Sequence, residues 1–242
     1  MSAGEDNMSK YYPIMLDIRG RSTIVIGGDR IAAEKAAALS ASGANVTVLS
    51  PEFCNELLLQ AERKRITLWQ KVYEPGDLES ALLVIAATND QKLIDAICAE
   101  TKERGQLVNI VDVPQYCSFI IPSILRREQL TIAVSTEGAS PGLAKRIRQS
   151  LEDLFPLAYG AYLRLASVAR AHLRKHGVSY ARRDDFFGEY YASNILAKLT
   201  DGKVEQAAEE TSDLLKTYDV TVSGSALEAG LEEKKNYVNQ YA

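Results

Sequence analysis

The stretch TIVIGGDRIAAEKAAALSASGANVTVLS, which runs from Thr23 to Ser50, decides the fold. An apolar, β-branched run leads into the pair Gly27-Gly28, and an alanine-rich segment follows it. A second β-branched run begins soon after Gly43. A strand, a glycine turn, a helix and a strand in this order predict a βαβ unit. In such a unit, the turn and the helix N-terminus receive the phosphates of a nucleotide.

The turn departs from the G-x-G-x-x-G/A pattern of dinucleotide-binding folds at its second glycine position, where Asp29 stands. Ala32 keeps the third position small, as close packing of helix on strand requires. An aspartate in the turn would repel a pyrophosphate unless it points away or pairs with Arg19 or Arg30. The alternative is a Rossmann-like domain that has kept the fold and lost the ligand.

Strand and helix patterns alternate up to about residue 113. Strands are predicted at 22–27, 45–49, 66–70, 82–87 and 106–111, and helices at 30–42, 52–63 and 90–104. Such short spacing predicts an α/β domain with a parallel sheet. The run LLVIAAT is continuously apolar, which is typical of a strand buried on both faces. We therefore predict a Rossmann-like domain at residues 1–113.

Two smaller sections follow. The segment SFIIPSILRREQLTIAVST predicts a strand pair around RREQ. A helix is then predicted from the N-cap Ser140 and Pro141, with an apolar stripe of Leu143, Ile147, Leu151 and Leu154. This α+β section covers residues 114–155. An apolar strand pair that nothing in its own chain covers needs a partner. Residues 156–242 predict a helical domain.

The composition excludes several classes of protein. The 242-residue chain has a net charge of −4, which argues against a nucleic-acid partner. It has no apolar run long enough for a membrane helix, and its start, MSAGEDNMSK, lacks the apolar core of a signal peptide. The three cysteines form no CxxC pair. We therefore expect a cytoplasmic protein with no membrane partner.

Five segments of the chain carry a family resemblance: GGDRIAAEKAAAL, GANVTVLSPEF, DLESALLVIAATND, LVNIVDVPQYCSFIIPSIL and LTIAVSTEGASPGLAKRIRQSLEDLFP. In this order they resemble the precorrin-2 dehydrogenase/sirohydrochlorin ferrochelatase family over about residues 11–156. The resemblance implies NAD-dependent oxidation of precorrin-2 to sirohydrochlorin in sirohaem synthesis. Insertion of Fe(II) is a second activity of the family. The resemblance also implies a homodimer that is held by the section 114–155. No methyltransferase section is found, so the chain resembles the free-standing form.

The resemblance also implies which residues contact NAD. Family members typically lack an acidic residue after the second strand, so the ending VLSP is ordinary for them, and Ser50 is left to bond the ribose. Thr88 and Asn89 match the loop beside the nicotinamide half. The predicted cofactor-binding residues are Gly27, Gly28, Asp29, Arg30, Ile31, Ser50, Pro51, Thr88 and Asn89.

Asp112, in NIVD, is the catalytic candidate. It follows a predicted buried strand, at the carboxyl edge where open α/β sheets bind ligands. A carboxylate there can accept a proton from the macrocycle, and it matches the aspartate that the family uses in both activities. The alternative is a cap or turn residue before Pro114. Asn109 either holds the loop by hydrogen bonding or contacts the substrate.

The substrate that the resemblance implies is a polycarboxylate, and arginine suits carboxylates. Basic residues are concentrated late in the chain, at Lys145, Arg146, Arg148, Arg164, Arg170, Arg174, Lys175, Arg182 and Arg183. One hypothesis is that part of this set lines a tetrapyrrole cleft between the nucleotide and helical domains. The alternative is a solvated helix face. Ser135, Thr136 and Arg146, near a helix N-terminus, are predicted to bind the substrate together with Asn109.

Two further patterns contain residue types that are used in metal or thiol chemistry. His172 and His176 stand four apart on a predicted helix, but no third ligand can be assigned, so we predict a surface face and no metal ligands. Cys117 is predicted to be a small buried residue. Two rival functions stay open. One is a chelatase-only relative in which Asp29 marks the loss of NAD binding, and the other is a non-catalytic module that senses a nucleotide or a tetrapyrrole.

Overall fold

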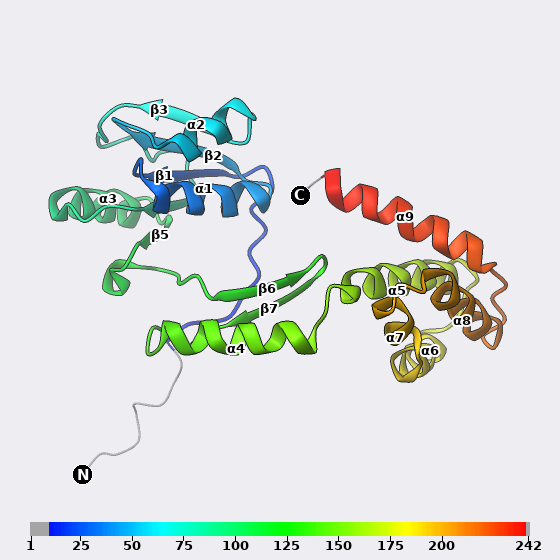
Figure 1. Ribbon diagram of the computed structural model, residues 1–242. Coiled ribbons are helices and arrows are strands. Elements are labelled where there is room, and N and C mark those ends of the chain that lie inside the picture. The colour runs from blue at the N-terminus through cyan, green and yellow to red at the C-terminus, as the bar shows by residue number, and fades with distance from the viewer. Residues whose placement is uncertain (1–9, 241–242) are drawn as a thin grey trace, which may run out of the picture. The chain divides into compact units, whose positions relative to one another are not determined.

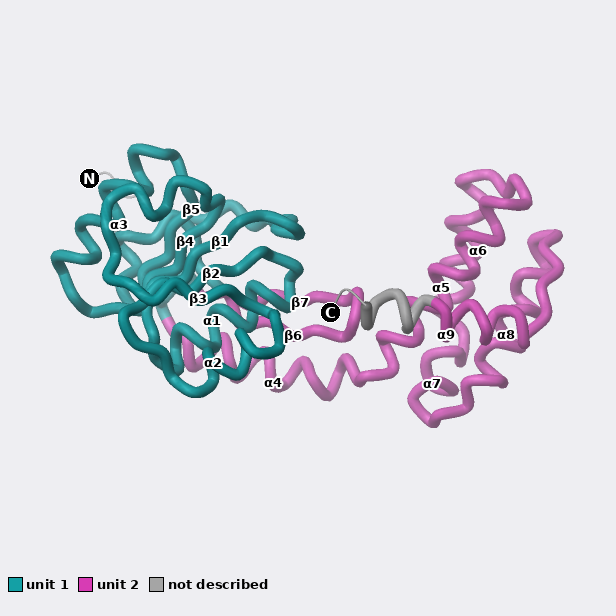
Figure 2. Tube along the Cα trace, turned by 90° about the horizontal axis from the view of Figure 1, so that it is seen from above, with its two compact units in different colours: residues 1–121, 137–139, 242 teal, residues 122–136, 140–241 magenta. Residues whose placement is uncertain are grey.

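The computed structural model describes residues 10–240, with side chains up to residue 233. The chain forms two compact units (Figures 1 and 2). Unit 1 comprises the chain up to Ile121 together with Glu137–Ala139, and unit 2 comprises Pro122–Thr136 and the chain from Ser140 onward. The three sections predicted from the sequence remain predictions. None of the helices in the described part combines the length and the apolar composition that a membrane span needs.

Unit 1 contains a five-stranded sheet in the order β3-β2-β1-β4-β5, and every pairing in it is parallel. The strands are β1 (Ser22–Ile26), β2 (Asn45–Ser50), β3 (Thr67–Gln70), β4 (Leu83–Ala86) and β5 (Leu107–Ile110). All five strands lie within a residue of the predicted bounds, so the predicted α/β fold is confirmed. The strand order reverses between β1 and β4, and open α/β sheets bind ligands at such a reversal.

Helices cover both faces of the sheet because its central strands β1 and β4 are apolar on both faces. Val25 and Ile85 pack with α1 (Arg30–Ala41) and α2 (Asn55–Glu62). Ile24 and Val84, the neighbours of these residues in sequence, pack on the opposite face with α3 (Gln91–Glu103). Figure 1 shows these three helices around the sheet. The sheet therefore lies between two separate apolar cores. The loops at the carboxyl ends of the strands are outside these cores and are available for function.

A buried carboxylate orders the loop between β3 and β4. Glu100, on α3, is 8% exposed. It accepts hydrogen bonds from the Tyr73 hydroxyl at 2.6 Å, from the Gly76 N–H at 3.0 Å and from the Leu78 N–H at 3.2 Å. The Arg104 Nε donates to the same carboxylate at 3.1 Å. No helix follows β3 in this described stretch of the chain, and the hydrogen bonds to the buried Glu100 carboxylate hold the β3–β4 loop in place instead.

Unit 2 begins with an antiparallel strand pair, β6 (Ser123–Arg127) and β7 (Leu130–Val134), which is the predicted hairpin. The helix α4 (Pro141–Leu154) packs on this pair. Its predicted N-cap is confirmed, since the Ser140 hydroxyl accepts from the Leu143 N–H at 3.3 Å. Most of the predicted apolar stripe on α4 lies outside the packed face: Leu143, Ile147 and Leu154 are 50%, 40% and 67% exposed.

The rest of unit 2 is helical, as predicted. Its helices are α5 (Ala158–Lys175), α6 (Tyr180–Ala192), α7 (Ile195–Thr200), α8 (Val204–Lys216) and α9 (Gly224–Gln240). They share one apolar core, in which Phe186 and Tyr190 are fully buried. Arg164, on α5, is 4% exposed and forms an ion pair with Glu128 in the β6–β7 turn. This ion pair, in which only the arginine is buried, joins the hairpin to the helical bundle.

Candidate functional site

The strand register brings the predicted nucleotide-binding residues to one edge of the sheet. Ile26 pairs with both Leu49 and Ala86, and Ala86 pairs with Ile110. Four strands therefore end at the same level. The segments that follow them, residues 27–31, 50–51, 87–89 and 111–112, lie along this carboxyl edge. They hold all nine predicted cofactor residues and Asp112.

The two glycines of the turn are required by close approach of the neighbouring loops. A Cβ on Gly28 would lie 1.8 Å from the Glu52 carbonyl oxygen and 2.6 Å from the Ser50 Oγ. Gly27 has a φ of 130°, and a Cβ there would lie 2.6 Å from the Ala87 carbonyl oxygen. The turn is therefore wedged between the ends of β2 and β4, and any side chain would displace it.

Asp29 is the N-cap of α1. Its carboxylate accepts a hydrogen bond from the Ala32 N–H at 2.9 Å, and its carbonyl accepts from the Ala33 N–H. No ion pair joins it to an arginine in the described part of the chain. Arg30 pairs with Glu34 at 3.5 Å, and Arg19 pairs with Asp17. Of the two arrangements predicted for Asp29, pairing with Arg19 or Arg30 is not found, and its carboxylate binds the backbone of the helix instead.

The first turn of α1 still offers donors to an anion. Within the described residues, the N–H groups of Arg30 and Ile31 meet no protein acceptor. The Ile31 side chain is 43% exposed, which is unusual for isoleucine so near a sheet edge. Free N–H groups at a helix N-terminus suit a phosphate, and an exposed apolar side chain beside them suits the body of a nucleotide.

The other predicted cofactor residues have local partners or are exposed. The Thr88 Oγ1 accepts from the Asp90 N–H at 3.2 Å, and Asp90 caps α3 through the Lys92 N–H at 2.9 Å. Ser50 is 8% exposed, at the end of β2. Pro51 and Asn89 are exposed. Their contacts with a cofactor remain predictions.

The Asp112 carboxylate has no polar partner among the described residues. It is exposed and has a φ of 61°, in the left-handed region. In the described part of the chain its carboxylate makes no hydrogen bond or ion pair, so it caps nothing. The short helix that follows, Pro114–Tyr116, begins after Val113 instead. Aspartate tolerates a left-handed conformation better than most residues, yet such conformations are frequent at functional sites.

Asn109 and Cys117 hold the loop that carries Asp112. The Asn109 Nδ2 donates to the Phe119 carbonyl at 3.0 Å, which favours the structural one of its two predicted roles. The Cys117 Sγ accepts from the Ile110 N–H at 3.2 Å. Burial raises the pKa of the Cys117 thiol, and the Ile110 hydrogen bond only partly opposes this, so the thiol is not activated as a nucleophile. Ser118 carries no signal in the sequence, yet it bonds Val108 through both its hydroxyl and its N–H.

The other predicted substrate residues belong to unit 2. Thr136 uses its Oγ1 to accept from the Ser140 N–H at 3.0 Å, just before α4. Ser135 and Arg146 are exposed, and Arg146 forms no ion pair with any described residue. Several members of the larger basic set are already committed to other partners: Arg164 to Glu128, Arg148 to Glu152, Arg182 to Asp219, and Arg170 to the ring of Phe187. Arg146 is therefore a better substrate candidate than these four.

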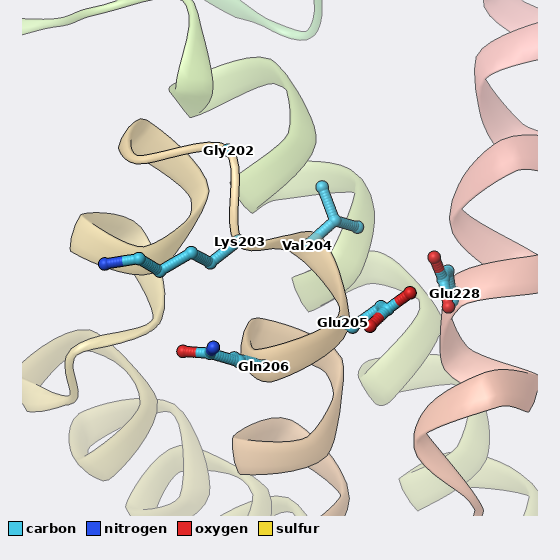
Figure 3. A pocket seen from close by; sticks show the side chains of 6 residues that line it. All are labelled: Gly202, Lys203, Val204, Glu205, Gln206 and Glu228. Atoms are coloured by element: carbon cyan, nitrogen blue, oxygen red, sulfur yellow. The ribbon is translucent and has the colours of Figure 1, made fainter.

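The histidine pair and the surface pockets of the described chain give no sign of a metal site. His176 places its Nδ1 2.9 Å from the His172 carbonyl oxygen, and burial lowers the pKa of His172. Among residues 10–233, no three acidic, histidine or cysteine side chains gather as a metal site would require. Figure 3 shows a pocket of about 230 Å³ beside Glu228 and the start of α8. A second pocket, of about 480 Å³, lies beside Trp69.

Two family models match this chain. A family model described as "Putative NAD(P)-binding" matches residues 14–123, and one described as "Sirohaem biosynthesis protein central" matches residues 127–154. The siroheme synthase of Photorhabdus laumondii is 33% identical over 87% of this chain, and that of Nitrosococcus oceani is 36% identical over 82%. This chain spans only 45% and 42% of those two proteins.

A solved structure shares nearly the whole architecture. The structure of "SirC, precorrin-2 dehydrogenase" matches with a TM-score of 0.71 and 27% sequence identity. The match covers 86% of this chain and 99% of the SirC chain. The likeness therefore extends beyond the sheet domain to the hairpin section and part of the helical section.

Proposed function

From the membership of this chain in the family of siroheme synthases and precorrin-2 dehydrogenases, we propose that it oxidises precorrin-2 to sirohydrochlorin in sirohaem synthesis, with NAD as the oxidant. One observation carries the proposal: the glycine turn and the unpartnered Asp112 carboxylate lie on the same edge of the sheet. A nucleotide site and a proton acceptor are the two elements that such an oxidation requires.

The residues at this edge fit a dinucleotide. NAD supplies the hydride acceptor when it is bound. The free N–H groups of Arg30 and Ile31 would hold the pyrophosphate, and Ser50 with Pro51 would hold the ribose. Thr88 and Asn89, on the far side of Gly27, would border the nicotinamide. The glycines hold the turn tight against β2 and β4, which lets the backbone approach the cofactor.

Asp112 is the proposed acceptor of the substrate proton. The oxidation removes a hydride and a proton from the substrate, and an exposed carboxylate that has no other partner can receive the proton. Asn109 supports the loop through Phe119 rather than touching the substrate. The substrate's carboxylates would be bound by Ser135, Thr136 and Arg146, of which Arg146 is exposed and free of ion pairs in the described chain.

The protein would act as a homodimer in the cytoplasm. The exposed stripe of Leu143, Ile147 and Leu154 on α4 supports the dimer, because apolar side chains that line one side of a helix favour a covering partner. The three free cysteines support a reducing compartment. Fe(II) would be a second substrate if the chain also inserts metal into sirohydrochlorin, with Asp112 accepting the pyrrole protons.

A chelatase-only function is the second candidate, and Asp29 supports it. Its carboxylate already bonds the Ala32 N–H, at the place where a phosphate oxygen would otherwise bind. An anion held there disfavours a pyrophosphate nearby. Titration with NAD separates the two functions: binding at micromolar concentrations removes the chelatase-only candidate, and an absence of binding at millimolar NAD supports it.

The decisive experiment is an anaerobic assay that follows NADH formation from precorrin-2. We expect turnover by the unmodified protein and a loss of about 100-fold or more in kcat for Asp112→Asn. The Asp112→Asn variant keeps the size of the side chain and tolerates the left-handed backbone, so its fold should be retained. Glu79→Gln, an exposed change on the β3–β4 loop, serves as the control. An unmodified protein that binds NAD but forms no NADH would contradict the proposal and favour a sensing module.

A further inference from the structure

The outer edge of β5 is closed by side chains. The Leu107 and Val111 N–H groups point inward, to carbonyls of the β4 side of the sheet. The Val108 and Ile110 N–H groups point the other way, where no strand follows. Val108 donates to the Ser118 Oγ at 2.8 Å, and Ile110 donates to the Cys117 Sγ at 3.2 Å. Two side chains thus take the places of the carbonyl groups that a sixth strand would offer.

The bonding is reciprocal. The Cys117 Sγ also lies 3.3 Å from the Ile110 carbonyl oxygen and 3.4 Å from that of Val113, within reach as a donor. The Ser118 N–H donates to the Val108 carbonyl at 2.8 Å. The amide of Asn109 reaches across to the Phe119 carbonyl at 3.0 Å. Residues 117–119 are therefore fastened one by one to residues 108–110, and we call these contacts the β5 clamp.

The β5 clamp closes a loop whose tip is Asp112. The loop leaves β5 at Ile110 and returns at Cys117, so the hydrogen bond from the Ile110 N–H to the Cys117 thiol joins its two ends. The Asp112 side chain makes no hydrogen bond or ion pair among the described residues, and its backbone is left-handed. Its orientation is therefore set through the backbone, and the backbone is set by the closure of the loop.

We propose that Cys117 is a positioning residue for Asp112, and that the β5 clamp as a whole fixes the carboxylate in the place where it receives the proton. This inference rests on the proposed function, since it assigns Asp112 a role in the oxidation. A positioned base loses efficiency steeply when it is displaced, because proton transfer depends on distance and direction. Cys117 suits this task because its thiol stays protonated: burial raises its pKa, so the S–H remains a donor to the Ile110 or Val113 carbonyl.

The test compares three variants with the unmodified protein. Cys117→Ala removes the thiol, Cys117→Ser restores a donor and an acceptor, and Cys98→Ala is the control. Cys98 is also a half-buried free thiol, which packs on the same apolar core as Cys117 but makes no side-chain hydrogen bond to the loop. Each variant is assayed for kcat and for the KM of NAD, and hydrogen exchange of the Ile110 amide is measured.

We expect Cys117→Ala to lower kcat about 10-fold with the KM of NAD unchanged. Its Ile110 amide should exchange faster, because its acceptor is gone. Cys117→Ser should recover most of kcat and of the protection, and Cys98→Ala should match the unmodified protein. A general loss of structure would instead raise the KM of NAD and would not be rescued by serine. If Cys117→Ala does not fold, Ser118→Ala tests the same clamp at Val108, with the same expected fall in kcat.

The outcomes distinguish the inference from the function on which it rests. Faster exchange at Ile110 with an unchanged kcat would overturn the positioning role and leave the proposed function standing. A fall in kcat for Cys98→Ala as large as that for Cys117→Ala would also overturn it. An unmodified protein that forms no NADH would overturn the proposed function, and the positioning role with it.

Discussion

The Asp29 carboxylate lies 2.9 Å from the Ala32 nitrogen and accepts its hydrogen bond, so α1 begins with an anion from its own chain. Capping by aspartate stabilises a helix N-terminus. The same contact uses a donor that dinucleotide-binding folds usually keep for a phosphate. Stability of the helix and affinity for a cofactor are therefore opposed at this residue, and substitutions can separate them.

Replacing Asp29 should strengthen NAD binding. We expect Asp29→Asn to lower the Kd of NAD about 10-fold, since it removes one negative charge near the pyrophosphate. The melting temperature should change little, because asparagine is also a good N-cap. Asp29→Gly should give a similar gain in affinity and lose only a few tenths of a kcal/mol in stability. Calorimetric titration measures the Kd of NAD for both variants, and thermal melting measures their stability. An unchanged Kd in both variants would show that the cap does not compete with the cofactor.

Gly28→Ala should disrupt the nucleotide turn. A Cβ placed 1.8 Å from the Glu52 carbonyl oxygen forces the end of β2 away from the turn. We expect a loss of about 1–3 kcal/mol in the free energy of unfolding, together with weaker NAD binding. The control is Gly188→Ala on α6, where a Cβ meets nothing within 4 Å and alanine should stabilise the helix by about 1 kcal/mol. Urea denaturation compares the two, and a neutral Gly28→Ala would contradict the close approach.

Glu100 should make stability depend on pH on the acid side. Burial raises its pKa, but the hydrogen bonds from Tyr73, Gly76 and Leu78, with the charge of Arg104, outweigh burial and lower it below the ordinary value of 4.5. The unfolded chain therefore takes up the proton at higher pH than the folded one. The stabilisation is complete above pH 4.5 and is lost as the pH falls through the lower, folded value.

The variant Glu100→Gln tests this dependence. At neutral pH it should cost about 1–3 kcal/mol, because an amide cannot satisfy all the donors that the carboxylate meets. The difference from the unmodified protein should shrink as the pH is lowered below 4.5. Urea denaturation across this range measures it, with the exposed change Glu79→Gln as the control. A difference that stays constant with pH would exclude the carboxylate as its source.

A charge on the exposed stripe of α4 should prevent dimerisation. Ile147 is 40% exposed on the apolar side of the helix. We expect Ile147→Asp to convert a dimer into a monomer, since burying a carboxylate in an apolar interface is costly. Gln149→Asp, on the polar side of the same helix, should leave the dimer intact. Sedimentation velocity measures both, and a dimer that survives Ile147→Asp would place the interface elsewhere.

The sequence predicted the sheet well because each strand of unit 1 has a local signal. The runs around Ile24 and Val84 are apolar on both faces, and glycines or capping residues end the neighbouring helices. The helix α6 has no such regular local signal. Its aromatic residues Phe186, Phe187 and Tyr190 do not form a regular stripe, and Gly188 interrupts it. The cap at Ser179, which accepts from the Arg182 N–H, was the signal that could have revealed it.

The grouping of the candidate residues at one edge of the sheet was predictable, but their contacts were not. The carboxyl edge follows from strand order, so Gly27, Ser50, Thr88 and Asp112 could be grouped in advance. The partner of Asp29 could not be predicted. The attraction of opposite charges favours an arginine, whereas the carboxylate accepts a hydrogen bond from the Ala32 backbone N–H. The roles of Cys117 and Ser118 depend on a return of the chain along β5, for which neither periodicity nor composition gives a sign.

The closure of β5 also bears on association between molecules. A bare edge strand offers a row of N–H and carbonyl groups on which another chain can pair, and proteins must block such pairing to stay dispersed. Here Ser118 and Cys117 already occupy the outward donors at Val108 and Ile110. An incoming strand would have to displace one of these side chains before it could bond to either N–H. The contacts that hold the Asp112 loop thus also protect this side of the sheet from aggregation by strand addition.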